Sequence, residues 1–155
     1  MPKQPLKSAF FSLGLSVLLI RPVTADYCQW QSEQIQGLIE INQPLCNLEG
    51  DVERGKRISI DRGLGNCLAC HQMPIPEESF HGQIGPPLVG VASRYSTGHL
   101  RLRLVNARLF NPMTIMPAYY LQPEKVNRIA FRYEKTTLLT AQQVEDVLAY
   151  LETLK

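Results

Sequence analysis

Apolar side chains recur at helical spacing in two segments of the second half of the chain. Residues 140–154 are predicted to form a helix, because an apolar stripe follows Thr140, which can form a capping box with Gln143. The stripe comprises Val144, Val147, Leu148 and Leu151. A second helix is predicted over residues 97–110 and ends before Asn111-Pro112. Its apolar positions are Leu100, Leu104, Val105 and Leu109.

A third helix is predicted over residues 51–65 from the polar residues at its ends. Asp51 can cap the first turn, and Glu53 suits the positive end of the helix dipole. Gly63 and Gly65 favour termination of the helix.

The remaining segments are less regular. Residues 73–87 contain four prolines and two glycines, which is typical of a loop. Residues 32–41 resemble a helix, and residues 117–135 show no clear period. The pattern contains no repeat and no clear sheet, so the predicted fold class is all-α, with the apolar helix faces forming one core.

The amino terminus has the pattern of a cleavable signal peptide over residues 1–25. Lys3 and Lys7 precede an apolar stretch over residues 9–20, and Val23-Thr24-Ala25 resembles a small-residue cleavage site. The apolar stretch is short for a membrane span, although an uncleaved anchor is the alternative. Cleavage removes three basic residues and no acidic one, so the formal net charge of +2 changes sign. The charge therefore gives no reason to expect a nucleic-acid partner, and an exported, periplasmic protein is predicted.

The most specific motif is Cys67-Leu68-Ala69-Cys70-His71. This is the pattern for covalent attachment of one haem c, in which both thiols add to the haem vinyl groups and the histidine ligates the iron. A zinc site normally needs a second pair of Cys or His ligands, and a thioredoxin-like pair needs a βαβ unit. Neither accompanying feature is visible, so the motif predicts a haem protein that transfers electrons.

Five side chains are candidates for the second axial ligand of the iron. They are Met73, Met113, Met116, His81 and His99. Met116 is favoured because Pro117 stiffens its loop and the predicted helix over residues 97–110 separates it from His71. Met113 is the nearest alternative, and ordinary core packing is the other interpretation of either methionine.

Cys28 and Cys46 are left over after the haem pair is assigned. In an exported protein such a pair often forms a disulfide, which we favour here because both cysteines lie in one short segment. The alternatives are two free thiols or a bond to another protein.

From the helix at Asp51 to the helix at Thr140, the chain resembles class I cytochromes c. The resemblance implies that residues 50–155 adopt the fold of that family, with helices wrapped around one haem. Residues 26–49 then form an amino-terminal extension. It also implies that the Pro86 carbonyl accepts a hydrogen bond from His71 and that Arg94 approaches a haem propionate. Gly55 and Tyr150 resemble the close helix crossing of the family.

A narrower resemblance is to the SoxX family, which are small mono-haem subunits of sulfur-oxidation complexes. The matching residues are Gly65-Asn66, Gly85-Pro86, Gly90-Val91, Arg94-Tyr95, Leu100-Arg101, Asn111-Pro112, Met116-Pro117, Tyr119-Tyr120 and residues 139–147. The resemblance implies a heterodimer with a larger haem subunit, SoxA, which carries the catalytic haem. That complex joins thiosulfate oxidatively to a cysteine of the SoxY carrier (in SoxYZ), as an L-cysteine S-thiosulfotransferase, and passes electrons to another cytochrome.

Three functions therefore remain open at this point. The first is the electron-transfer subunit of a thiosulfate-oxidising complex, with no catalytic residue of its own. The second is an autonomous soluble electron carrier, and the third is a haem sensor with a labile sixth ligand. The segment over residues 115–121 discriminates the first two, because a permanent partner would cover it. Tyr119 and Tyr120 could belong either to that interface or to the core.

Overall fold

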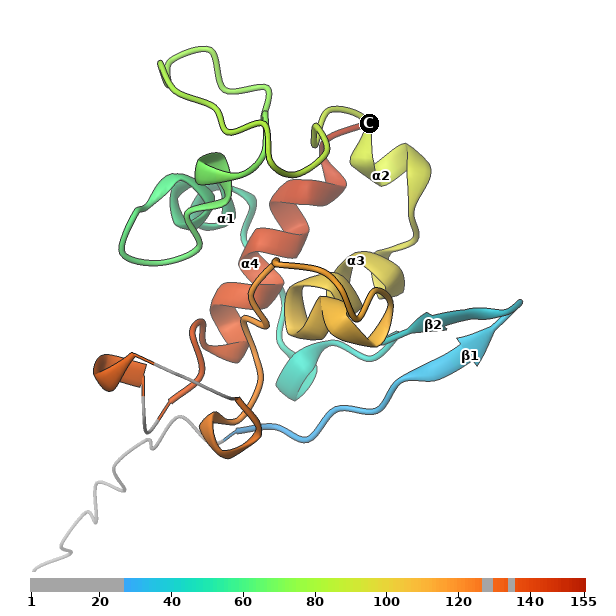
Figure 1. The fold of residues 1–155 in the computed structure, drawn as a ribbon. Coiled ribbons are helices and arrows are strands. Elements are labelled where there is room, and N and C mark those ends of the chain that lie inside the picture. Colours follow the sequence, from blue (N-terminus) through green and yellow to red (C-terminus); the bar gives the residue numbers. More distant parts are fainter. Residues whose placement is uncertain (1–26, 127–129, 134–135) are drawn as a thin grey trace, which may run out of the picture.

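Four helices and one small hairpin make up the regular structure of the residues described in the computed structural model, which are 27–126, 130–133 and 136–155 (Figure 1). The helices are α1 (Val52–Ile60), α2 (Val91–Arg94), α3 (Thr97–Asn106) and α4 (Ala141–Glu152), and the strands are β1 (Glu33–Ile35) and β2 (Leu38–Glu40). Short 3-10 turns lie at Leu45–Asn47, Cys67–Ala69, Ala107–Leu109, Pro123–Lys125 and Phe131–Tyr133. The predicted all-α architecture is confirmed, while the predicted signal peptide lies outside the described residues.

Helices α1 and α4 cross in direct backbone contact. A Cβ atom on Gly55 would overlap the Asp146 carbonyl and lie 3.0 Å from the Tyr150 Cβ. The crossing that the cytochrome resemblance implied is therefore present, and glycine is required there because no side chain fits. The predicted stripe of α4 forms the centre of the core, with Val144 and Val147 fully buried.

The predicted helix caps are confirmed, although the predicted ends are not. The Asp51 side chain accepts a hydrogen bond of 2.7 Å from the Arg54 amide, and Thr140 and Gln143 form the complete capping box of α4. Helix α1 stops at Ile60 instead of residue 65, because the backbone of Asp61 is extended and its carboxylate accepts from the Gly63 amide. Helix α3 ends at Asn106 and continues as a 3-10 turn to Leu109.

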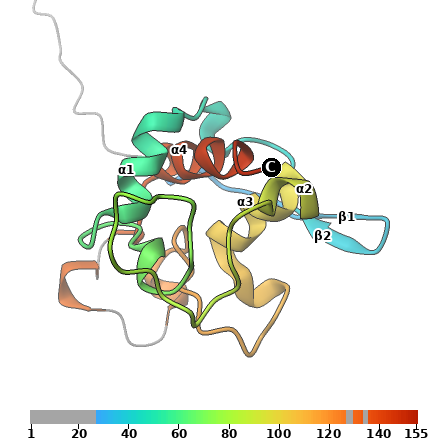
Figure 2. The same ribbon diagram turned by 90° about the horizontal axis from the view of Figure 1, so that it is seen from above.

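The helix predicted over residues 32–41 is wrong, since this segment is a β-hairpin that projects from the helical body in Figure 2. Ile35 pairs with Leu38, which leaves Gln36 and Gly37 as a two-residue turn with φ angles of 50° and 85°. Two positive φ values define the type I′ turn, which matches the twist of the strands. Glycine at the second position favours that turn more than the apolar residues favour a helix.

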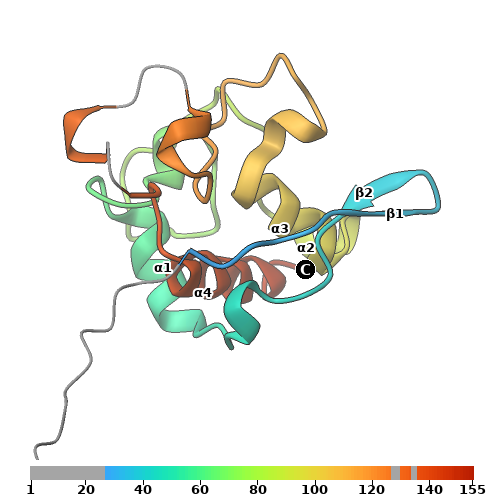
Figure 3. The same cartoon turned by 90° about the horizontal axis from the view of Figure 1, so that it is seen from below.

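The segment that follows the hairpin is joined to the helices by a buried ion pair. The Arg101 guanidinium donates two hydrogen bonds, of 2.9 and 3.0 Å, to the Glu145 carboxylate. Arg101 also donates to the Ile41 carbonyl, and Glu145 accepts from the Leu45 amide. Figure 3 shows this segment running from the hairpin back toward α4. Because both charges are paired and hydrogen-bonded, their burial is tolerated.

The disulfide that we favoured between Cys28 and Cys46 is confirmed, with a Cα–Cα distance of 5.4 Å. The bond links the start and the end of the amino-terminal extension, with the hairpin between the two cysteines. Among the described residues, no helix has both the length and the apolar character that crossing a membrane requires.

Candidate functional site

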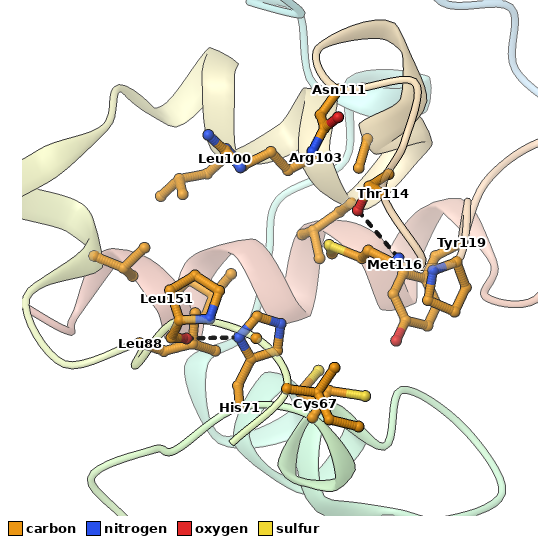
Figure 4. Close-up of a pocket in the computed structure, with 18 of the residues that line it drawn as sticks. Cys67, His71, Leu88, Leu100, Arg103, Asn111, Thr114, Met116, Tyr119 and Leu151 are labelled. Atoms are coloured by element: carbon orange, nitrogen blue, oxygen red, sulfur yellow. Dashed lines mark hydrogen bonds between the residues drawn. The ribbon is translucent and has the colours of Figure 1, made fainter. Parts of the chain in front are cut away.

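The five-residue motif forms one tight turn at the base of a cavity (Figure 4). Residues Cys67–Ala69 are a 3-10 turn, and the amides of Cys70 and His71 both donate to the Cys67 carbonyl. Cys67, Cys70 and His71 all line the cavity. One turn therefore presents two thiols and one imidazole to the same space, as attachment of a porphyrin requires.

The proline-rich loop folds back against this turn. The amides of Gly82, Gly85 and Leu88 donate to the carbonyls of residues 68, 70 and 72 with distances of 2.7, 2.8 and 2.9 Å. A Cβ atom on Gly85 would lie within 3.0 Å of the His71 ring, so the loop passes directly against the imidazole. Only glycine allows this approach without displacing the ring.

The hydrogen bond that the resemblance implied for His71 is present. Its Nδ1 lies 2.7 Å from the Pro86 carbonyl oxygen, which accepts a hydrogen bond from the Nδ1–H group and leaves the lone pair of Nε2 available for a metal ion. Arg94 holds the next part of the loop, because its guanidinium donates to the carbonyls of Pro87 and Val89 at 2.8 and 2.6 Å. In the structure Arg94 thus anchors the segment that carries the Pro86 acceptor.

The five candidates for the sixth ligand have different surroundings. Met116 lines the cavity, whereas the side chain of Met113 is 87% exposed and lies outside it. Met73 is buried in the core, and His99 is buried in an aromatic cluster. Both ring nitrogens of His81 contact the backbone, at Met73 and Glu78. Of these five, Met116 alone lines the same cavity as His71.

The cavity between His71 and Met116 has a volume of about 380 Å³, within the range typical of cofactor pockets. Its walls are mainly apolar, with Leu100 and Leu104 from α3 and Leu151 from α4. An apolar cavity with two thiols, an imidazole and a thioether suits a haem well, because the large ring needs apolar cover and the iron needs axial donors. Among the described residues, no group of three or more His, Cys, Asp or Glu side chains could hold a metal ion.

Burial controls the protonation of two side chains in the cavity wall. It raises the pKa of the Cys67 thiol to about 11, so this thiol is protonated at neutral pH before it is attached to a haem. Burial also raises the pKa of Tyr119, whose hydroxyl donates to the Gly65 carbonyl at 2.8 Å. Tyr119 and Tyr120 are 8% and 2% exposed, so both belong to the core rather than to an exposed interface.

Arg103 is a further cavity-lining residue, which belongs to none of the motifs above. Its spacing relative to Leu100, Leu104 and Ala107 places it on the apolar face of α3. A charged residue within an apolar helical stripe was the signal that could have identified it.

Comparison with known proteins agrees with this geometry. The Cytochrome c family model matches residues 52–155. No curated protein sequence matches the chain. A chain in the crystal structure of SoxXA from P. pantotrophus is 37% identical, with a TM-score of 0.69, and the match covers 75% of this chain and 90% of that one. The family match spans the whole helical domain and every cavity-lining residue discussed above, so the chain belongs to the cytochrome c family.

Proposed function

We propose that this protein is the small, mono-haem electron-transfer subunit of a SoxXA-type complex that oxidises thiosulfate in the periplasm. The similarity to a SoxXA chain over 90% of that chain's length is the observation that carries the proposal. Because the chain belongs to the cytochrome c family, its cofactor is one covalently bound haem c. We also propose that residues 1–25 are a cleaved signal peptide, since haem c is attached after export.

The proposed roles of the site residues follow from their positions around the cavity. Bound haem supplies a reversible one-electron change at its iron. Cys67 and Cys70, which line the cavity, would hold the ring by thioether bonds, and His71 and Met116 would bind its iron. The Pro86 carbonyl holds the His71 proton on Nδ1, which strengthens the imidazole as a donor.

Binding of the iron by both His71 and Met116 would favour electron transfer over substrate chemistry at the haem. A methionine ligand also stabilises the ferrous state and raises the reduction potential. Leu100, Leu104 and Leu151 would cover the ring with apolar side chains, so little solvent would have to rearrange when the charge changes.

The SoxX resemblance supplies the proposed reaction. A sulfur–sulfur bond forms between thiosulfate and a cysteine thiolate of the SoxY carrier, and two electrons are released. The larger subunit, SoxA, is proposed to hold the catalytic haem and the activated sulfur. This chain would accept the electrons one at a time and deliver them to a downstream cytochrome.

The experiment that tests this proposal is purification of the natively expressed protein from periplasmic extract. We expect a stable heterodimer with a second haem polypeptide, whose haem is reduced when thiosulfate and the SoxYZ carrier are added together. A lone monomer would instead indicate the autonomous electron carrier. Rapid binding of carbon monoxide to the ferrous protein would indicate a sensor with an open axial position.

A further inference from the structure

Arg103 is held in the cavity wall by aromatic rings. Its guanidinium carbon lies 4.5 Å from the ring centroid of Tyr95 and 4.3 Å from that of Phe110. The His99 ring stacks on the Tyr95 ring with a centroid distance of 5.1 Å and meets the Phe110 ring edge-on with a centroid distance of 4.9 Å. His99 therefore packs against both of the rings that contact Arg103. Two cation–π contacts fix the direction of a planar guanidinium that is otherwise free to rotate.

The positive charge of Arg103 has no anionic partner among the described residues. Its buried Nε–H group donates no hydrogen bond to any described residue. The neighbouring cations differ in this respect, since Arg101 is paired with Glu145 and Arg94 donates to two carbonyls. Burial and the charge of Arg103 lower the pKa of His99, which is therefore neutral at pH 7 and cannot compensate the guanidinium. An unpaired donor in a cavity wall is costly unless a ligand satisfies it.

Arg103 also lies on the appropriate side of the cavity for the charged edge of a haem. Figure 4 shows Cys67 and Arg103 at opposite ends of the cavity, with His71 and Met116 between them. The vinyl groups must lie near Cys67 and Cys70, and the two propionates leave the opposite edge of the ring. A carboxylate is the group that a guanidinium binds best, often with two parallel hydrogen bonds.

We propose that the Arg103 guanidinium binds a haem propionate in the mature protein and that Tyr95 and Phe110 fix its direction. This role is additional to the one that the cytochrome resemblance implied for Arg94, whose terminal nitrogens already donate to the backbone. Neutralising a propionate removes negative charge close to the iron and favours the ferrous state. Arg103 therefore helps to keep the reduction potential high.

The test uses the purified mature protein alone, so its outcome is independent of the proposed SoxXA assembly. Arg103→Met keeps the apolar stem and removes the charge and the donors. We expect a lower reduction potential and a shift of the propionate bending band in the resonance Raman spectrum. The electronic absorption bands of the axial ligands should stay unchanged.

Arg108→Met is the matched control, because it removes the same charge from an exposed position in the turn after α3. It should leave the Raman band unmoved and change the potential less. If the reduction potential of Arg103→Met equals that of Arg108→Met, the proposal is overturned. It is also overturned if Arg103→Met lowers the reduction potential but leaves the propionate bending band unshifted. If Arg103→Met fails to fold, Arg103→Gln also removes the positive charge, and an unmoved propionate band would again overturn the proposal.

Discussion

Met113 and Met116 are three residues apart in one loop, yet only the second faces the cavity. The loop direction is set by two local contacts, in which Asn111 Oδ1 accepts from the Met113 amide and Thr114 Oγ1 accepts from the Met116 amide. These turns direct Met113 toward solvent and leave Met116 partly buried against the core. The proposed ligand is therefore selected by backbone geometry as well as by residue type.

Replacing Met116 by Ala is expected to abolish the weak sulfur-to-iron charge-transfer band of the ferric protein and to lower the reduction potential, because the thioether stabilises ferrous iron. Met113→Ala is the matched control and should keep both properties. Absorption spectroscopy and redox titration of the two variants check this. Loss of the band in Met113→Ala instead would move the axial ligand to residue 113.

The residues of the site differ in how far the sequence could predict them. Cys67, Cys70 and His71 follow from spacing, because their chemistry requires one turn of backbone and no distant contact. Arg103 does not, since its role depends on rings from two other segments, Tyr95 and Phe110, whose approach is a property of the folded chain.

Elements with strong local signals were predicted well, and those set by turn geometry were not. The apolar stripe and capping box of α4 agree with each other, and the helix forms where both predict it. The segment over residues 32–41 contains Ile35, Leu38 and Ile39, whose spacing fits a helix as readily as a hairpin. The deciding feature is the Gln36–Gly37 turn, which is a weaker signal in sequence than Asn-Gly or Asp-Gly.

At the crossing of α1 and α4, Gly55→Ala is expected to destabilise the protein by about 1–3 kcal/mol, the usual cost of overpacking a core. The added methyl group would meet the Asp146 carbonyl and the Tyr150 side chain. This cost should exceed the gain of about 0.5–1 kcal/mol that alanine gives over glycine in a helix. Denaturant unfolding measures the difference.

Gly63→Ala is the control for this prediction, since a Cβ atom there meets only the Asp61 carboxylate, at 3.2 Å, in an exposed turn. Equal stability of Gly55→Ala and the parent protein would show that the two helices can separate slightly without cost.

The disulfide makes a separate contribution to the extension. Replacing both Cys28 and Cys46 by Ser is expected to lower the free energy of unfolding by about 3 kcal/mol, because the bond closes a loop with a sequence separation of 18 residues. In the proposed mature protein Cys67 and Cys70 are bonded to haem, and a reducing agent does not cleave thioether bonds, so a reducing agent acting on the parent protein should reproduce the effect. Unchanged stability in both experiments would mean that noncovalent contacts such as the buried Arg101–Glu145 pair are sufficient to hold this segment in place.

Across the whole molecule, two neighbouring carboxylates on α4 connect segments that are far apart in sequence. Glu145 binds Arg101 of α3 and the Leu45 amide of the extension. Asp146 accepts from the Asp51 amide and from both Nε and a terminal nitrogen of Arg54, at 2.8, 2.9 and 3.0 Å. One turn of the last helix therefore joins the extension, α1 and α3, so the extension is part of the domain rather than an appended tail.

This arrangement makes stability depend on pH through Asp146. Burial alone would raise its pKa, but hydrogen bonds from Arg54, Gln142 and the Asp51 amide outweigh burial and hold the pKa below its usual range. A carboxylate whose pKa is lowered on folding stabilises the folded state fully above its unfolded pKa of about 3.9, and this stabilisation is lost as pH falls through the folded pKa.

Asp146→Asn should therefore lower the free energy of unfolding by about 1–3 kcal/mol at neutral pH, the usual cost of disrupting hydrogen bonds to a buried polar group. The difference from the parent protein should shrink as the pH falls below about 4, because the unfolded parent chain then binds a proton and the folded carboxylate is protonated only at still lower pH. Denaturant unfolding at a series of pH values measures both effects, and Glu124→Gln, at an exposed position, is the control. A difference that stays constant down to the lowest pH would mean that the asparagine variant loses packing rather than charge, and that Asp146 does not couple the helices to pH.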